Sequence, residues 1–129
     1  MTKEDERLLA EARRTREFAY APYSRFAVGA AVLGTSGKIY GGCNVENGAF
    51  SLTNCAERTA IFQAVAAGET AFRALAVIAD TAAPVSPCGA CRQVMAEFRI
   101  PRVIMANLVG AVREMTLEEI LPAAFEEEA

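Results

Sequence analysis

Two short strings of sequence constrain this chain more than any other feature. They are Cys-Ala-Glu at residues 55–57 and Pro-Cys-Gly-Ala-Cys at residues 87–91. Three thiolates can hold one metal ion only if the fold brings both strings together. The chain contains no histidine, so the commonest general base in enzymes is absent. Any proton transfer must therefore use a carboxylate or a water molecule that the metal activates.

The cysteine spacing predicts a metal site with an open position. Cys88 and Cys91 are three residues apart, so a helix would place them on one face, where they can share an ion. Cys55 would add a third sulfur from the start of another helix, and helix N-termini favour thiolates. Zinc suits thiolates without redox chemistry, and three protein ligands leave the fourth position for water. We therefore expect one catalytic Zn²⁺ per chain.

Charged residues beside the two strings point to catalysis. Three thiolates leave zinc with a net negative charge, which makes it a weaker acid for its water. Arg58 and Arg92 each follow directly on a ligand string, and we expect both to offset that charge. Glu57 is rotated by roughly 200° from Cys55 around a helix. It should therefore not bind the same ion but lean over the open position and carry protons.

The residues alone leave other interpretations open. Asn54 and Glu57 also fit a capping box at a helix start. A lone Cys-x-x-Cys string also fits a redox motif or half of a structural zinc site. Cys43 could supply a fourth sulfur and close the site, although it follows two glycines at an expected strand end and is more typical of a small buried side chain.

Hydrophobic periodicity and turn residues predict the fold. Length and apolar content fit one domain over residues 1–129. Helices are expected over residues 3–19, 55–67, 87–98 and 117–120, and strands over residues 26–33, 38–44, 75–79, 103–108 and 111–114. The tight turn at residues 109–110 requires the last strand to return antiparallel. This order predicts an α/β fold with three α/β/α layers, in which a mixed five-stranded sheet has helices on both faces.

Composition disfavours several classes of partner. The net charge is −3 and the arginines are scattered, so binding to a long nucleic acid is not expected. No apolar run approaches the roughly 20 residues of a membrane span. The polar N-terminus has no signal-peptide pattern, so we expect a cytoplasmic protein whose cysteines are thiols or ligands. The apolar fraction of 53% favours burial between subunits.

The two strings together resemble the cytidine deaminase family, in which zinc deaminases with three cysteines are a known variant. The likeness covers nearly the whole chain, and the closing residues 121–125 are similar to those of the short, homotetrameric form. The segments that carry the likeness are Ala21–Phe26, Val28–Ala31, Gly42–Asn47, Asn54–Ala60 and Ser86–Gln93.

The resemblance implies a reaction and its residues. Cytidine and 2'-deoxycytidine would be hydrolysed to uridine and 2'-deoxyuridine plus ammonia, in pyrimidine salvage. Cys55, Cys88 and Cys91 would hold the zinc. Glu57 would take a proton from the activated water and pass protons to N3 of cytosine and then to the departing ammonia.

The resemblance also implies the substrate contacts of a small nucleoside. Asn44 and Glu46 would hydrogen-bond the ribose, and their spacing places both on one side of an extended segment. Phe26 would pack on the pyrimidine, and Ala56 would offer its backbone N–H to the base. Phe125 would reach into a neighbour's pocket, so that the active sites of a homotetramer are completed across subunits.

Three rival functions are weighed against the residues. A related deaminase could act on blasticidin S, but Glu46 is not expected there. A polynucleotide-editing deaminase would need a basic groove. A non-enzymatic zinc module would surround its ion with protein ligands and need no Glu57. Phe50 stands where the family usually has tyrosine, so any hydrogen bond from that hydroxyl is lost.

Overall fold

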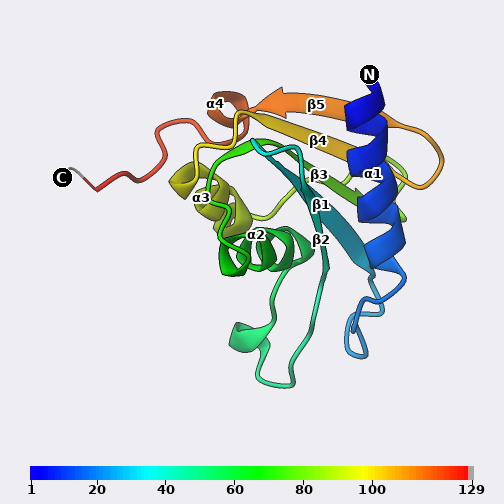
Figure 1. Cartoon of the computed structure of the whole chain (residues 1–129). Helices are drawn as coiled ribbons and strands as arrows, with labels where there is room; N and C mark the ends of the chain where they lie inside the picture. Colours follow the sequence, from blue (N-terminus) through cyan, green and yellow to red (C-terminus); the bar gives the residue numbers. More distant parts are fainter. Residues whose placement is uncertain (128–129) are drawn as a thin grey trace.

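A mixed five-stranded sheet forms the middle layer of the fold (Figure 1). The structure, a computed structural model, describes residues 1–127, so the end of the acidic tail at residues 128–129 lies outside it. The strands lie in the order β2-β1-β3-β4-β5, with β3 and β4 parallel and the other neighbours antiparallel. Their bounds are β1 Val28–Gly34, β2 Ile39–Cys43, β3 Phe72–Ala79, β4 Arg102–Asn107 and β5 Val112–Thr116.

Helices cover both faces of this sheet, which confirms the predicted three layers. One face is covered by α1, and α2 and α3 lie on the other (Figure 1). The helix bounds are α1 Lys3–Arg16, α2 Ala56–Ala66, α3 Gly89–Glu97 and α4 Leu117–Ile120, with a 3₁₀ turn, η1, at Phe50–Leu52. Within residues 1–127, the structure contains no helix with the length and apolarity needed to cross a bilayer.

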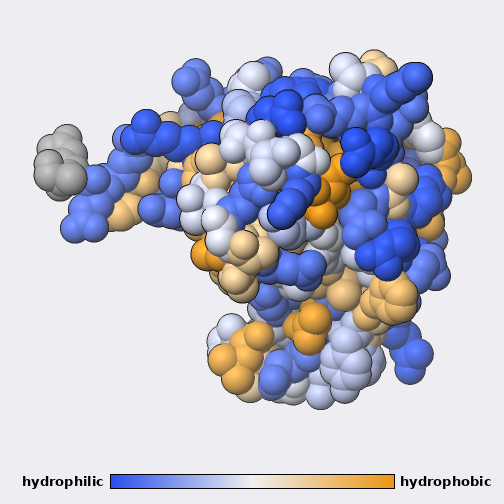
Figure 2. Space-filling view, in the orientation of Figure 1, coloured by the Kyte–Doolittle hydropathy of each residue, from blue (hydrophilic) through white to orange (hydrophobic). Residues whose placement is uncertain are grey.

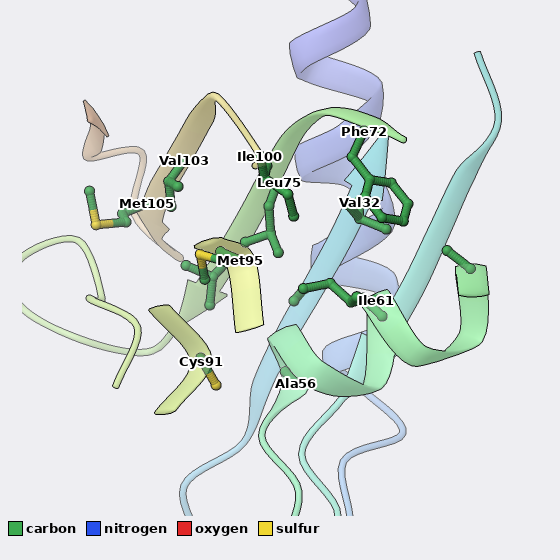
Figure 3. Close-up of a cluster of buried hydrophobic side chains, with 14 of the residues drawn as sticks. Val32, Ala56, Ile61, Phe72, Leu75, Cys91, Met95, Ile100, Val103 and Met105 are labelled. Atoms are coloured by element: carbon green, nitrogen blue, oxygen red, sulfur yellow. The ribbon is translucent and has the colours of Figure 1, made fainter. Parts of the chain in front are cut away.

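Two clusters of buried side chains separate the layers, because successive strand residues point to opposite faces. In β1, Ala30 and Val32 join the cluster under α2 and α3, whereas Ala31 and Leu33 join the cluster under α1. Figure 3 shows the first of these clusters, in which Ala56 and Cys91 lie among the core side chains. The starts of α2 and α3 are therefore anchored in the core.

Two glycines allow the helices to approach the sheet closely. A Cβ atom on Gly42 of β2 would overlap the backbone of α2 at Ala56 and Ala60. A Cβ atom on Gly29 of β1 would overlap the carbonyl oxygen of Ala12 in α1. Gly42 thus permits the short distance between β2 and the helix that begins beside Cys55.

Two predicted helix boundaries are wrong, and caps explain both. The helix α1 ends at Arg16 rather than near residue 19, with Glu17 as its C-cap. The helix α3 begins at Gly89 with Cys88 as its N-cap, rather than at residue 87. The sulfur of Cys88 accepts the Cys91 N–H at 3.4 Å, a hydrogen bond that a serine or threonine hydroxyl commonly makes at an N-cap. The strand β3 also begins three residues earlier than predicted, at Phe72.

Candidate active site

Three sulfur atoms converge where the N-terminal ends of α2 and α3 meet. The Sγ atoms of Cys55, Cys88 and Cys91 all lie within 4.8 Å of one another, and those of Cys55 and Cys88 are 3.8 Å apart. Zinc–sulfur bonds of about 2.3 Å in a tetrahedron place sulfurs about 3.8 Å apart. The donor set and its spacing therefore fit a zinc ion with three protein ligands.

The helix caps create this convergence. Cys55 and Cys88 are the N-caps of α2 and α3, and Cys91 is the third residue of α3. Backbone N–H groups at a helix N-terminus lack intrahelical acceptors, and the dipole is positive there. Both features favour thiolates over thiols. Cys91 is buried, Cys55 is half-buried and Cys88 is exposed, so the cluster lies at the edge of the core.

Arg58 contributes a positive charge to the cluster. Its Nη2 donates to Cys55 Sγ at 3.1 Å. Hydrogen bonds from Cys91 and Arg58 hold the pKa of the Cys55 thiol well below its ordinary value. Sharing a proton with the Cys55 sulfur, together with burial, raises the pKa of Cys91. The guanidinium of Arg58 therefore lies beside a cluster sulfur, where its positive charge can compensate the negative charge of the thiolates.

Arg92 makes different contacts from those expected. Its Nε donates to the carbonyl oxygen of Pro87 at 2.9 Å, and its Nη1 donates to that of Ile120 at 2.8 Å. These bonds direct the guanidinium toward two carbonyls instead of toward a sulfur. Arg92 therefore fixes the backbone before Cys88 and joins α3 to the end of α4. That its positive charge offsets the charge of the thiolates stays a prediction.

Glu57 is a buried carboxyl beside the sulfur cluster. It is the second residue of α2 and is only 5% exposed. Burial, reinforced by the charge of Cys55, raises the pKa of Glu57 to about 7. Such a value is typical of a group that exchanges protons near neutrality. The capping-box alternative is wrong, because Cys55 is the cap and the Asn54 Nδ2 donates to Thr59 Oγ1 at 3.0 Å.

Cys43 lies at the end of β2 and is outside the sulfur cluster. The metal-capable group found among residues 1–127 consists of three sulfurs and leaves Cys43 out. Burial raises the pKa of the Cys43 thiol, which disfavours a thiolate there. The geometry therefore gives no support to a closed site of four cysteines.

The segment after β2 lies directly beside the start of α2. Val45 and Asn54 exchange two backbone hydrogen bonds of 2.9 Å. Asn44 and Glu46 flank Val45, and Asn54 precedes Cys55. The two residues expected to contact ribose are therefore adjacent in space to the backbone that carries the first cysteine.

Both of these polar residues also hold the loop at residues 20–28. Asn44 is buried; its Nδ2 donates to the Phe26 carbonyl at 2.8 Å and its Oδ1 accepts the Val28 N–H at 2.9 Å. The Glu46 carboxylate accepts hydrogen bonds from Ser24 and from the backbone of Tyr23. Sequence reasoning missed Ser24, because only its place in the Tyr-Ser-Arg-Phe string indicated a role.

The structure places the remaining expected contacts in three surroundings. Phe26 is 41% exposed at the end of this loop, and buried Ala56 is the first residue of α2, where a backbone N–H has no intrahelical acceptor. Phe125 is 76% exposed, and its carbonyl accepts from Gln93 Nε2 at 2.9 Å. Phe50 packs edge-on against Tyr23, with ring centroids 6.0 Å apart.

Apolar side chains are exposed near these loops. Figure 2 shows hydrophobic residues at the lower end of the molecule, below the sheet. Exposed aromatic and aliphatic residues of the two loops that follow α1 and β2 are Phe18, Tyr20, Tyr23, Phe26, Val45, Phe50 and Leu52. Exposed apolar groups in such numbers are typical of a binding surface.

A three-sulfur zinc site beside a buried carboxyl, on an α/β/α fold, defines the class of zinc-dependent hydrolytic enzymes. A family model described as the cytidine and deoxycytidylate deaminase zinc-binding region matches residues 2–107. The chain belongs to this family. Hydrolytic deamination is the family's chemistry, and zinc is its metal.

Relatives and solved structures agree with that assignment. A cytidine deaminase of Sporosarcina psychrophila is 58% identical over 126 residues, covering 95% of this chain and 92% of the relative. One from Halalkalibacterium halodurans is 53% identical over 120 residues, covering 92% and 91%. The crystal structure of a cytidine deaminase from Burkholderia pseudomallei matches with a TM-score of 0.91 and 50% identity, covering 97% and 100%.

Proposed function

We propose that this chain hydrolyses cytidine and 2'-deoxycytidine to uridine and 2'-deoxyuridine plus ammonia, as a step of pyrimidine salvage. The main support is the convergence of three sulfurs beside the buried carboxyl of Glu57, in a member of a deaminase family. Cys55, Cys88 and Cys91 hold the zinc, and residues 1–129 act as one catalytic domain.

Glu57 carries the protons of the reaction. Zinc bound to the three sulfurs supplies the Lewis acidity that turns a water molecule into a nucleophile for C4 of cytosine. Glu57 would accept one proton from the attacking water and donate it to N3. It would then take the remaining proton of the hydroxyl now on C4 and pass it to the amino group, so that the C4–N bond breaks, ammonia leaves and the C4 carbonyl forms. Its burial keeps bulk water away from the carboxyl and supports a pKa suited to both transfers. Arg58 keeps Cys55 a thiolate through its hydrogen bond to the sulfur.

Four residues orient the nucleoside. Asn44 and Glu46 hydrogen-bond the sugar from the segment that pairs with the start of α2. Phe26 packs on the pyrimidine, and the free N–H of Ala56 binds the base. The support for this arrangement is that one loop, held by Asn44 and Glu46, carries the exposed ring of Phe26.

The proposed assembly is a homotetramer in which Phe125 enters a neighbour's site. The exposed ring of Phe125, on a segment tied to α3 through Gln93, supports this proposal. We expect sedimentation of a tetramer, and Phe125→Ala to raise KM about tenfold, as loss of a buried aromatic contact would. A monomer with full activity would contradict it. The four free cysteines support action in a reducing compartment such as the cytoplasm.

The direct test follows cytidine by its ultraviolet absorbance. The purified protein should convert cytidine and contain one zinc per chain, and a chelator strong enough to remove zinc should abolish turnover until zinc is restored. Blasticidin S serves as the comparison substrate. Turnover that survives complete zinc removal, or a preference for blasticidin S over cytidine, would contradict the proposal.

A further inference from the structure

A serine in the loop after α1 links two of the residues proposed to contact substrate. The Ser24 hydroxyl donates to Glu46 Oε2. The backbone N–H groups of Tyr23 and Ser24 donate to the other carboxylate oxygen, Oε1, at 2.9 Å and 3.1 Å. The Ser24 Oγ also accepts the N–H of Phe26 at 3.0 Å. One hydroxyl thus fixes both the Glu46 carboxylate and the backbone of Phe26.

The backbone around Ser24 adopts a conformation that needs such support. Arg25 has a φ of +57°, in the left-handed region that non-glycine residues rarely adopt. The Arg25 N–H donates to the Ala21 carbonyl at 3.0 Å, and the Ser24–Phe26 bond closes the turn around it. Strained backbone of this kind persists where surrounding contacts hold it, and it is frequent at ligand sites.

The Glu46 carboxylate keeps one acceptor position free. An ionised carboxylate has about four lone-pair sites, and Ser24 and Tyr23 fill three of them. A sugar hydroxyl can donate to the remaining site only if the carboxylate keeps this orientation. The Glu46 N–H donates to the Tyr20 carbonyl at 2.8 Å, so the backbone of Glu46 is fixed while its side chain depends on the loop.

We propose that Ser24 is a positioning residue for the sugar of the substrate, acting by holding the Glu46 carboxylate toward a sugar hydroxyl. This inference rests on the proposed function, because the contact between Glu46 and ribose is part of it. The hydrogen bond from Ser24 is also the main reason that the pKa of Glu46 is lowered. Ser24 therefore helps to keep Glu46 an acceptor as well as oriented.

The molecule contains a matched arrangement that can serve as a control. Ser36 donates through Oγ to Glu69 Oε1 at 2.7 Å and through its N–H to Oε2 at 3.0 Å. The N–H of Lys38, two residues on, donates to Ser36 Oγ at 3.2 Å. This turn joins β1 to β2 at the upper end of the sheet in Figure 1, whereas the loop of Ser24 lies at the lower end.

The first experiment compares Ser24→Ala, Ser24→Thr and Ser36→Ala in steady-state turnover of cytidine. Ser24→Ala should raise KM about tenfold while kcat changes less than about threefold, as expected when an interaction made equally in the ground state and transition state is lost. Ser24→Thr keeps the hydroxyl and should stay close to wild type. Ser36→Ala should leave both constants unchanged and lower the melting temperature as much as Ser24→Ala does.

The second experiment repeats Ser24→Ala in a Glu46→Gln background. If Ser24 acts through Glu46, the serine change should raise KM less than about twofold there, because coupled residues are not additive. An equal effect in both backgrounds, an unchanged KM in an active Ser24→Ala enzyme, or unfolding of Ser24→Ala alone would overturn the inference. Wild-type protein without activity on cytidine would instead overturn the proposed function as well, so the two failures are distinguishable.

Discussion

The buried acidic side chains on the two faces of the sheet have opposite surroundings. On the α1 face, Asp5 is buried but paired, with its Oδ2 accepting from Arg102 Nη2 at 3.0 Å, and Arg102 also pairs with Glu114 at 2.8 Å. On the face of α2 and α3, Glu57 is equally buried, yet no ion pair within residues 1–127 includes it. On the α1 face the Asp5 carboxylate is held in an ion pair, whereas on the other face the Glu57 carboxyl can exchange protons.

This difference indicates that one face of the sheet contributes mainly to the free energy of unfolding and the other also to turnover. Burying an unpaired, charged carboxylate is unfavourable. Burial therefore raises the pKa of Glu57, which favours its neutral, protonated form. Pairing, in contrast, lowers the pKa of Asp5. We therefore expect changes on the α1 face to alter the free energy of unfolding alone, and changes on the other face to alter turnover as well.

The largest expected effect is that of Glu57→Gln. The amide keeps the shape of the side chain but cannot exchange protons, so kcat for cytidine should fall by about 10³-fold, within the usual range for a general acid–base group. Zinc content should remain one per chain, and stability should not decrease because a neutral amide avoids the burial of a charge. Glu97→Gln, at the exposed end of α3, is the matched control. Normal turnover by Glu57→Gln would refute the proposed proton transfer.

The next effect separates the two faces through their cores. Leu8 of α1 and Ile61 of α2 are both fully buried, so replacing either with alanine should cost about 3 kcal/mol of unfolding free energy in chemical denaturation. Only Ile61→Ala should also lower kcat or zinc affinity, because α2 carries Cys55 and Glu57. If Leu8→Ala changed turnover at a temperature where it stays folded, the separation of the faces would be wrong.

A smaller effect concerns the paired carboxylate and its dependence on pH. The hydrogen bond from Arg102 lowers the pKa of Asp5 below its ordinary value of 3.8. The stabilisation is therefore complete above that ordinary value and is lost as the pH falls through the lower, folded-state pKa. Asp5→Asn should reduce the unfolding free energy by about 2 kcal/mol at pH 7, the usual worth of a hydrogen bond to a charged group.

Measuring denaturation of wild type and Asp5→Asn from pH 7 to pH 2 tests this prediction. The difference between the two proteins should shrink below about pH 4, where the unfolded carboxyl becomes protonated. Glu6→Gln, in the same turn of α1 but exposed, is the control and should show no such trend. A difference that stays constant down to pH 2 would contradict the assignment to ionised Asp5.

The sequence predicted those features of the fold that depend on residues close together along the chain. The order of elements, the antiparallel return of β5 and the two faces follow from periodicity and turn lengths. The cysteine cluster was also predictable, because both strings begin helices. The start of α3 was not predictable, because its N-cap is Cys88 and cysteine is not among the residues usually found at that position.

Contacts between segments that lie far apart in the sequence could not be predicted from it. The bond from Ser24 to Glu46 joins residues that the sequence separates widely, and it depends on the bridge of Val45 to both Tyr20 and Asn54. The direction of Arg92 likewise depends on where the end of α4 lies. Sequence position placed this arginine beside a ligand, but packing decided which oxygens it binds.

The smallest expected effect tests whether the sulfur cluster is complete with three members. Cys43 is the last residue of β2, the strand that packs against α2 at Gly42, yet its sulfur is outside the group of three. Cys43→Ser should retain one zinc per chain and near wild-type kcat, with a change in unfolding free energy below about 1 kcal/mol because the side chain is only partly buried. Cys91→Ser is the contrasting variant and should lose zinc. Loss of zinc from Cys43→Ser would mean that the site closes around a fourth sulfur, and the open position on which the proposed chemistry depends would not exist.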